Sequence, residues 1–229
     1  MIDPRAAGKN LKHTMNEETR DRRCGAGRAR RAAGAGLVGV GLMLFAGCSV
    51  LPPATPDLTR YYVITSPAVA APAAEAGAGP RLFLRPVVVP EFLRGKIMPV
   101  RVGTNELHFV DEARWAEPLE PGLTRALRDG LGQLPAVRVV ARGGDAHDLD
   151  VTVQLRDCEG VLPDGTARLA AHIEIQTAEI EPKLVAQDDF STDLPGWDGK
   201  DYGQLAKKLS EAAEALAGRI GTLATMRNK

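Results

Sequence analysis

An uncharged, apolar run from Ala32 to Ala46 divides the chain and decides which part of it can fold. The run has 15 residues and follows a stretch rich in arginine. A basic flank and a short apolar core are typical of a secretory signal. A transmembrane helix needs roughly 20 apolar residues, so the run is too short to span a bilayer. We therefore expect residues 1–47 to direct export and then to be removed, whether translation starts at Met1 or at Met15.

The apolar run ends in Phe45-Ala46-Gly47-Cys48, which resembles the lipobox of bacterial lipoproteins. In that motif small side chains precede a cysteine that is acylated before cleavage, because the peptidase must bring the backbone beside the lipidated sulfur. Phe45 departs from the pattern, which usually has leucine there. The resemblance implies that Cys48 is lipidated and that Ser49 directs the protein to the periplasmic face of the outer membrane. The alternative is an ordinary signal with a chance cysteine.

Removal of residues 1–47 changes the charge and the cysteine count. The chain has 29 Lys/Arg and 29 Asp/Glu, of which this segment holds 9 and 4, so the other 182 residues carry 20 basic and 25 acidic side chains. The net charge of about −5 disfavours nucleic-acid binding, which needs a basic stripe. Only Cys158 remains for the folded part, so no internal disulfide can form. We interpret it as a small strand residue, since no basic partner indicates a nucleophile.

Two stretches rich in Pro and Ala, residues 49–60 and 66–80, have a composition that does not form a packed core. Between them, residues 61–65 are strong strand formers. We therefore assign residues 48–80 to a lipidated N-terminus and flexible tether with a short strand at 61–65. Residues 81–229 then form a globular domain, and their number suits a single domain.

The periodicity of residues 81–229 predicts two helices and several strands. Leucines three or four residues apart predict a helix over 119–134, and a similar pattern predicts one over 202–226, with Asp201 as its cap. Alternating apolar residues in 149–159 and 166–177 predict an antiparallel pair with one buried face. Shorter strands are expected at 82–89, 98–102, 106–110, 137–141 and 184–191. These elements predict an α+β fold, an antiparallel or mixed sheet with two main helices packed on one face, in a single domain.

The sequence contains no recognisable catalytic constellation. A Gly-x-Ser-x-Gly elbow and a phosphate-binding loop are both absent. Alternation predicts that His108 and His172 face solvent, and His147 lies in the polar loop 143–150, whose acidic residues match no calcium or zinc spacing. We therefore expect no enzymatic activity, no metal and no cofactor.

The two tryptophans after residue 47 lie in different surroundings. Trp115 directly precedes the first predicted helix, so we expect its ring to cover the core there. Trp197 lies among turn residues and is predicted to be exposed. An exposed tryptophan is a frequent contact at binding sites, so Trp197 is a candidate contact for a partner.

The order of motifs along the chain carries a resemblance to a known family. After Gly47-Cys48 come Tyr61-Tyr62-Val63-Ile64, Val89-Pro90-Glu91-Phe92-Leu93, Arg114-Trp115-Ala116-Glu117-Pro118-Leu119, Leu131-Gly132-Gln133-Leu134-Pro135 and Asp201-Tyr202. In this order the chain resembles the ABC-type transport auxiliary lipoproteins, the group that includes paraquat-inducible protein C. Phe92 departs from the family, which more often has tyrosine at that position.

The resemblance implies an auxiliary docking subunit of an intermembrane lipid transport system. Its partners would be an MCE-domain periplasmic protein and an inner-membrane ABC transporter, and the subunit itself a possible homo-oligomer. Candidate partner contacts lie in the segment 90–101 and the loop 193–199, namely Pro90, Phe92, Leu93 and Trp197. One alternative is a lipid-binding shuttle, which is disfavoured because the helices' leucines are needed to fill one modest core. A third class, an envelope hydrolase, lacks a nucleophile with a base beside it.

Overall fold

The computed structural model describes residues 56–66 and 79–226, which belong to one compact unit that begins at Pro56. The predicted signal, the lipobox (Phe45, Ala46, Gly47) and Cys48 lie outside the described residues. Among the helices that are described, none is long and apolar enough to cross a membrane.

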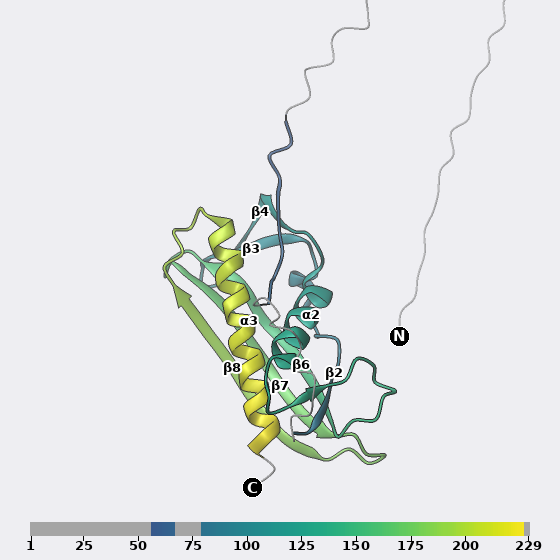
Figure 1. Cartoon of the computed structure of the whole chain (residues 1–229). Helices are drawn as coiled ribbons and strands as arrows, with labels where there is room; N and C mark the ends of the chain where they lie inside the picture. The colour runs from purple at the N-terminus through teal and green to yellow at the C-terminus, as the bar shows by residue number, and fades with distance from the viewer. Residues whose placement is uncertain (1–55, 67–78, 227–229) are drawn as a thin grey trace, which may run out of the picture. The chain divides into compact units, whose positions relative to one another are not determined.

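The described residues form a mixed sheet of eight strands with two helices packed on it (Figure 1). The helices are α2 (Leu119–Gly132) and α3 (Tyr202–Thr225), and a short 3-10 helix, η1, spans Glu91–Leu93. The strands are β1 (Arg60–Tyr62), β2 (Arg81–Leu84), β3 (Ile97–Gly103), β4 (Glu106–Trp115), β5 (Arg138–Val139), β6 (Leu149–Val161), β7 (Thr166–Thr177) and β8 (Leu184–Pro195). The α+β fold expected from the sequence is confirmed.

Strand β6 organises the sheet. It pairs antiparallel with β7, which pairs antiparallel with β8. Its other edge is shared, because β2 runs parallel to residues 149–151 and β3 runs parallel to residues 160–161. The short strand β5 extends the sheet beyond β2, while β4 and then β1 extend it beyond β3. The parallel and antiparallel pairings together make the sheet mixed.

A β-bulge in β6 changes which side chains face the helices. Up to Leu155 the odd-numbered residues are buried, as the alternation predicts. Between Leu155 and Asp157 the register to β7 shifts, since a bulge inserts one extra residue. Cys158 is therefore buried and paired with Leu169, and burial raises the pKa of its thiol to about 12. A thiol in that state is an inert packing residue, in agreement with the interpretation from sequence.

The helices α2 and α3 pack on each other and on one face of the sheet. Each presents a stripe of leucines and alanines to a continuous core that also contains the inner side chains of β6 and β7. The start of α3 is capped as predicted, since Oδ1 of Asp201 accepts hydrogen bonds from the N–H groups of Gly203 (2.9 Å) and Gln204 (3.1 Å).

The short strand near the N-terminus is part of the sheet. In β1, Tyr62 pairs in parallel with Trp115 of β4, and the N–H of Ala116 donates to the carbonyl oxygen of Tyr62 (2.7 Å). Ile64, two residues later, is buried in the core. The sequence predicted this strand as part of the tether, whereas its pairing makes it an edge strand of the folded unit.

Candidate functional site

Trp197 lies in the core and not on the surface, so its prediction as an exposed contact is wrong. Only 2% of the residue is exposed, and its Nε1–H donates to the carbonyl oxygen of Asp201 (3.0 Å). Its own N–H donates to the carbonyl oxygen of Gly165 (2.9 Å). The ring lies over Gly160 of β6, where a Cβ would be 2.6 Å from the ring atom Cη2. Trp197 therefore joins the β6–β7 turn to the start of α3.

A sequence signal for this arrangement was present. A glycine inside a strand often marks the close approach of another group, and Gly160 is such a glycine in β6. The turn residues around Trp197 correctly indicate a loop. The indole ring nevertheless points inward, because Gly160 has no side chain and leaves space for it on the sheet. The loop 193–199 thus contributes no exposed aromatic contact.

In the segment around η1, one predicted partner contact is exposed and another is buried. Leu93 is buried in the core, so its prediction as a partner contact is wrong. Phe92, its neighbour, has 41% of its surface exposed, and Pro90 is half-buried. The N–H of Leu93 donates to the carbonyl oxygen of Pro90 (3.0 Å), and that of Arg94 to Glu91 (3.1 Å). The turn is therefore held by its own hydrogen bonds and by Leu93, with Phe92 on the outside.

Trp115 is buried where β4 leads into α2, as predicted from sequence. Its N–H donates to the carbonyl oxygen of Lys96 (2.6 Å), which ties the end of β4 to the start of β3. Among the residues that the structure describes, its Nε1–H has no hydrogen-bond partner. Trp115 thus acts in packing.

A buried ion pair connects β3 to β6, and sequence reasoning missed it. Glu159 is fully buried and forms a two-pronged pair with Arg101, in which Nε contacts Oε1 and Nη2 lies 3.2 Å from Oε2. Asp157 lies 3.8 Å from the same guanidinium. Burial raises the pKa of Glu159, and the hydrogen bond and charge of Arg101 oppose that shift. The pair satisfies a charge that burial alone would disfavour, and it connects two parallel strands.

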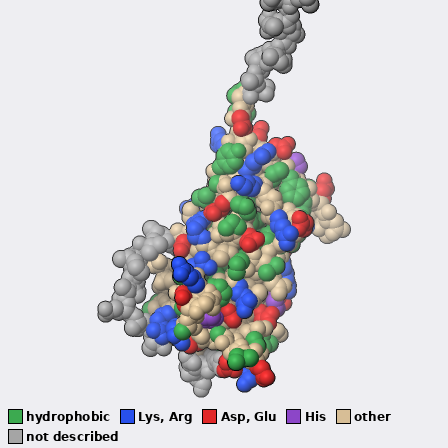
Figure 2. All heavy atoms as spheres, turned by 90° about the vertical axis from the view of Figure 1, so that its right-hand side faces the viewer, with side chains coloured by type: hydrophobic (Ala, Val, Ile, Leu, Met, Phe, Trp, Pro, Cys, Tyr) green, Lys and Arg blue, Asp and Glu red, His purple; other side chains and the backbone are tan. Residues whose placement is uncertain are grey.

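The described residues contain no group of three or more His, Cys, Asp or Glu side chains placed to hold a metal ion. The Nδ1 atoms of His147 and His172 lie 2.7 Å from the carbonyl oxygen of Asp145 and a carboxylate oxygen of Asp189, respectively. On the face shown in Figure 2, basic, acidic and hydrophobic side chains are interspersed. That face offers no extended region of one charge sign.

Comparison with known proteins identifies the family. The sequence profile of the ABC-type transport auxiliary lipoprotein component matches residues 62–221. The chain belongs to this family. The resemblance drawn from the order of motifs is therefore confirmed, and a transport-related role and a lipoprotein's association with a membrane follow from it. No curated protein sequence matches the auxiliary lipoprotein.

Two crystal structures share the fold of this auxiliary lipoprotein. One is protein XCC0632 from Xanthomonas campestris, of the family DUF330, with 18% identity and a TM-score of 0.62 over 74% of this chain and 98% of that one. The other is an uncharacterized protein with 18% identity and a TM-score of 0.60 over 72% of this chain and 97% of that one. At this identity the likeness concerns the fold alone.

Proposed function

We propose that this auxiliary lipoprotein, anchored through Cys48 in the outer membrane, is the periplasmic docking subunit of an ABC/MCE-type lipid transport system. Its partner is an MCE-domain protein that works with an inner-membrane ABC transporter, and the lipoprotein is not an enzyme. The observation that carries the proposal is the family match over residues 62–221. The sequence Ala46-Gly47-Cys48 at the end of an apolar run supports the anchor.

The surface around η1 supports a docking role. Phe92 is an exposed aromatic ring on a turn whose next residue, Leu93, is fixed in the core. A ring held in this way loses little conformational entropy when a partner covers it, and aromatic anchors of this kind dominate the energetics of many interfaces. In the proposal, the ring of Phe92 enters an apolar site of the MCE-domain protein, and a homo-oligomer of the lipoprotein multiplies that contact.

A lipid-binding shuttle remains the second candidate, and the packing of the core argues against it. Leu127 and Leu131 of α2 and Ile220 of α3 are fully buried in the continuous core between the helices and the sheet. Two surface clefts of about 510 and 450 Å³ are lined largely by charged and polar side chains. An acyl chain needs an apolar enclosure, which neither cleft provides.

The test is purification of the tagged full-length lipoprotein from envelopes solubilised in mild detergent, with mass spectrometry of what accompanies it. We expect an MCE-domain protein with the wild type, and about tenfold less of it, or about 1.4 kcal/mol, with Phe92→Ala. Phe109→Ala is the matched control, because Phe109 in β4 is also 41% exposed. Phospholipid held in a closed pocket with no protein partner would favour the shuttle.

A further inference from the structure

The position of Cys48 in the sequence determines which end of the folded unit lies near the membrane. Pro56 is the eighth residue after Cys48, and an extended chain of eight residues reaches about 28 Å at most. Residues 56–66, blue in Figure 1, enter the unit at the end where α3 begins. Helix α3 has 24 residues, so the opposite end is about 36 Å further away. With Cys48 anchored as proposed, the entry end is therefore the end that the anchor holds within about 28 Å of the membrane.

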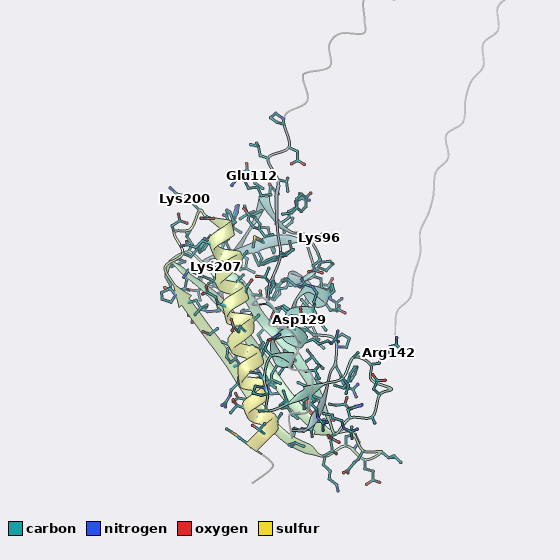
Figure 3. The ribbon with its side chains drawn as sticks, viewed as in Figure 1. Lys96, Glu112, Asp129, Arg142, Lys200 and Lys207 are labelled. Carbon is teal, nitrogen blue, oxygen red and sulfur yellow. The ribbon has the colours of Figure 1, made fainter. Side chains whose placement is uncertain are left out.

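A cleft of about 510 Å³ opens at this entry end. Its volume lies within the roughly 300–1,000 Å³ that is usual for small-molecule sites. Three chain segments line it. Leu58, Arg60 and Tyr62 come from β1 and the residues just before it, Glu112 comes from β4, and the start of α3 and the loop before it supply Asp198, Lys200, Asp201 and Tyr202. Figure 3 shows the labelled Glu112 and Lys200 at this same end.

The charges in the cleft are of both signs and form no close ion pair with one another. Across residues 56–66 and 79–226, no ion pair within 4.0 Å involves Arg60, Lys200, Glu112 or Asp198. Oδ1 of Asp198 accepts the N–H groups of Asp201 and Lys200 (2.8 Å each), which lowers the pKa of this carboxyl. Its negative charge is therefore present at neutral pH.

Two tyrosines add hydroxyl groups to the cleft. Neither Tyr62 nor Tyr202 makes a side-chain hydrogen bond within the described part of the chain. Burial raises the pKa of Tyr202, so its phenol stays protonated and able to donate. Leu58 and Tyr61 are exposed close by in sequence. Tyrosine is enriched where a protein meets the boundary between membrane and water, because its ring is apolar and its hydroxyl is polar.

The helix terminus itself is not the binding group. Asp201 already accepts from the N–H groups of Gly203 and Gln204, so these amides of α3 are occupied. A ligand in the cleft is therefore recognised by side chains. The cleft contains two cations, Arg60 and Lys200, and three carboxylates, one of them the helix cap Asp201. Charges of both signs suit a ligand that carries both, whereas a purely anionic ligand would meet like charge at Glu112 and Asp198.

We propose that this cleft binds the head group of a zwitterionic, amine-bearing phospholipid of the outer membrane, with Arg60 and Lys200 on the phosphate and Glu112 and Asp198 on the ammonium group. Guanidinium and phosphate match in charge and geometry. The site rests on the proposed anchor at Cys48 and not on the MCE partner. A segment of the partner protein is the competing occupant, and a titration without any MCE protein distinguishes the two.

The test uses the full-length mature lipoprotein with its acyl chains, purified in non-ionic detergent. Dihexanoyl phosphatidylethanolamine, dihexanoyl phosphatidylglycerol and inorganic phosphate are titrated separately, and heat of binding is measured. We expect the ethanolamine lipid to bind at least about tenfold more tightly than the other two. Arg60→Gln and Glu112→Gln should each weaken it about tenfold, whereas Lys207→Gln, an exposed α3 residue outside the cleft (Figure 3), should not.

Three results would overturn the proposal. Equal binding of both lipids by all variants would mean detergent-like partition, and binding of inorganic phosphate as tight as that of the lipid would mean a general anion site. Loss of the MCE-domain protein from Glu112→Gln, without any lipid binding by the wild type, would assign the cleft to a protein segment. Because the titration contains no MCE protein, its failure leaves the docking function standing, and loss of docking leaves the titration interpretable.

Discussion

Trp197 packs on Gly160 so closely that a Cβ at position 160 would lie 2.6 Å from the ring atom Cη2. The contact joins the loop that precedes α3 to the last turn-proximal residues of β6, 37 residues earlier in the chain. The glycine makes the site for the ring, and the ring in turn fixes where α3 begins, through its hydrogen bond to Asp201.

Gly160→Ala is therefore expected to destabilise the folded unit. The added methyl group has to displace a buried indole, and overpacking of this kind costs about 1–3 kcal/mol. Urea unfolding followed by tryptophan fluorescence measures the change. Gly218→Ala in α3 is the matched control, because nothing lies within 4 Å of its added Cβ. Alanine is the better helix former by up to about 1 kcal/mol, so that variant should gain stability.

Both tryptophans are expected to be stability residues. Trp115→Ala and Trp197→Ala each remove a side chain from the core, and such truncations cost about 3–5 kcal/mol. For Trp197 this reverses the expectation from sequence, in which a surface ring would leave melting unchanged. Thermal unfolding followed by circular dichroism distinguishes the two, and an unchanged melting temperature for Trp197→Ala would contradict the structure.

The burial of Trp115 was predictable and that of Trp197 was not, for a physical reason. Trp115 lies between a strand and a helix, and the apolar periodicity of each predicts which of its faces is buried. The local sequence pattern is therefore enough to predict that the Trp115 ring is buried. Trp197 lies in a loop, which has no apolar periodicity. The direction of its side chain depends on the space beside Gly160, on a strand that is distant in sequence. The burial of Leu93 was not predicted for the same reason, because a helical turn of three residues is too short to show an apolar periodicity.

Charged groups show the same limit. Arg101 and Glu159 are 58 residues apart, and they meet because β3 runs parallel to the end of β6. Parallel pairing is a tertiary property that alternation does not reveal. The bulge after Leu155 also moved Cys158 out of the phase that the first half of β6 predicts. The long strands, both helices and the cap at Asp201 depend on local sequence patterns, and these elements were predicted.

Asp148 and Arg81 are expected to make stability depend on pH in acid. The side chain of Arg81, and then its main-chain N–H, lower the pKa of Asp148 from 3.8 to about 2. Because the folded-state value is the lower one, the stabilisation is present above about pH 3.8 and is lost as the pH falls through 2. The two side chains are 38% and 45% exposed, so solvent screening limits the effect to about 1 kcal/mol at most.

Asp148→Asn should accordingly lower the free energy of unfolding by up to about 1 kcal/mol at pH 7, and the difference from the wild type should disappear near pH 2. Urea unfolding at pH 7, 4, 3 and 2 measures it, at points chosen to bracket about 2 to 3.8. Glu214→Gln, at an exposed position of α3, is the control and should show no such trend. A constant difference at every pH would rule out the ion pair as the cause.

Cys48→Ala is expected to abolish acylation and to leave the precursor uncleaved by the lipoprotein peptidase. Mass spectrometry of the N-terminus and fractionation of the two membranes measure both effects. Cys158→Ala is the matched control, since that thiol is buried and should have no part in anchoring. A wild-type N-terminus at another residue, without lipid, would refute the anchor, and recovery in the inner membrane would refute the sorting drawn from Ser49.

The docking role is tested most directly by photo-crosslinking in intact envelopes. A photoreactive phenylalanine analogue is placed at Phe92 in one strain and at Phe109, which has the same exposed fraction, in another. Irradiation followed by mass spectrometry should give a covalent adduct of the lipoprotein with an MCE-domain protein from position 92 and not from position 109. Adducts with phospholipid alone at position 92, or with the MCE-domain protein from position 109 only, would contradict docking through η1.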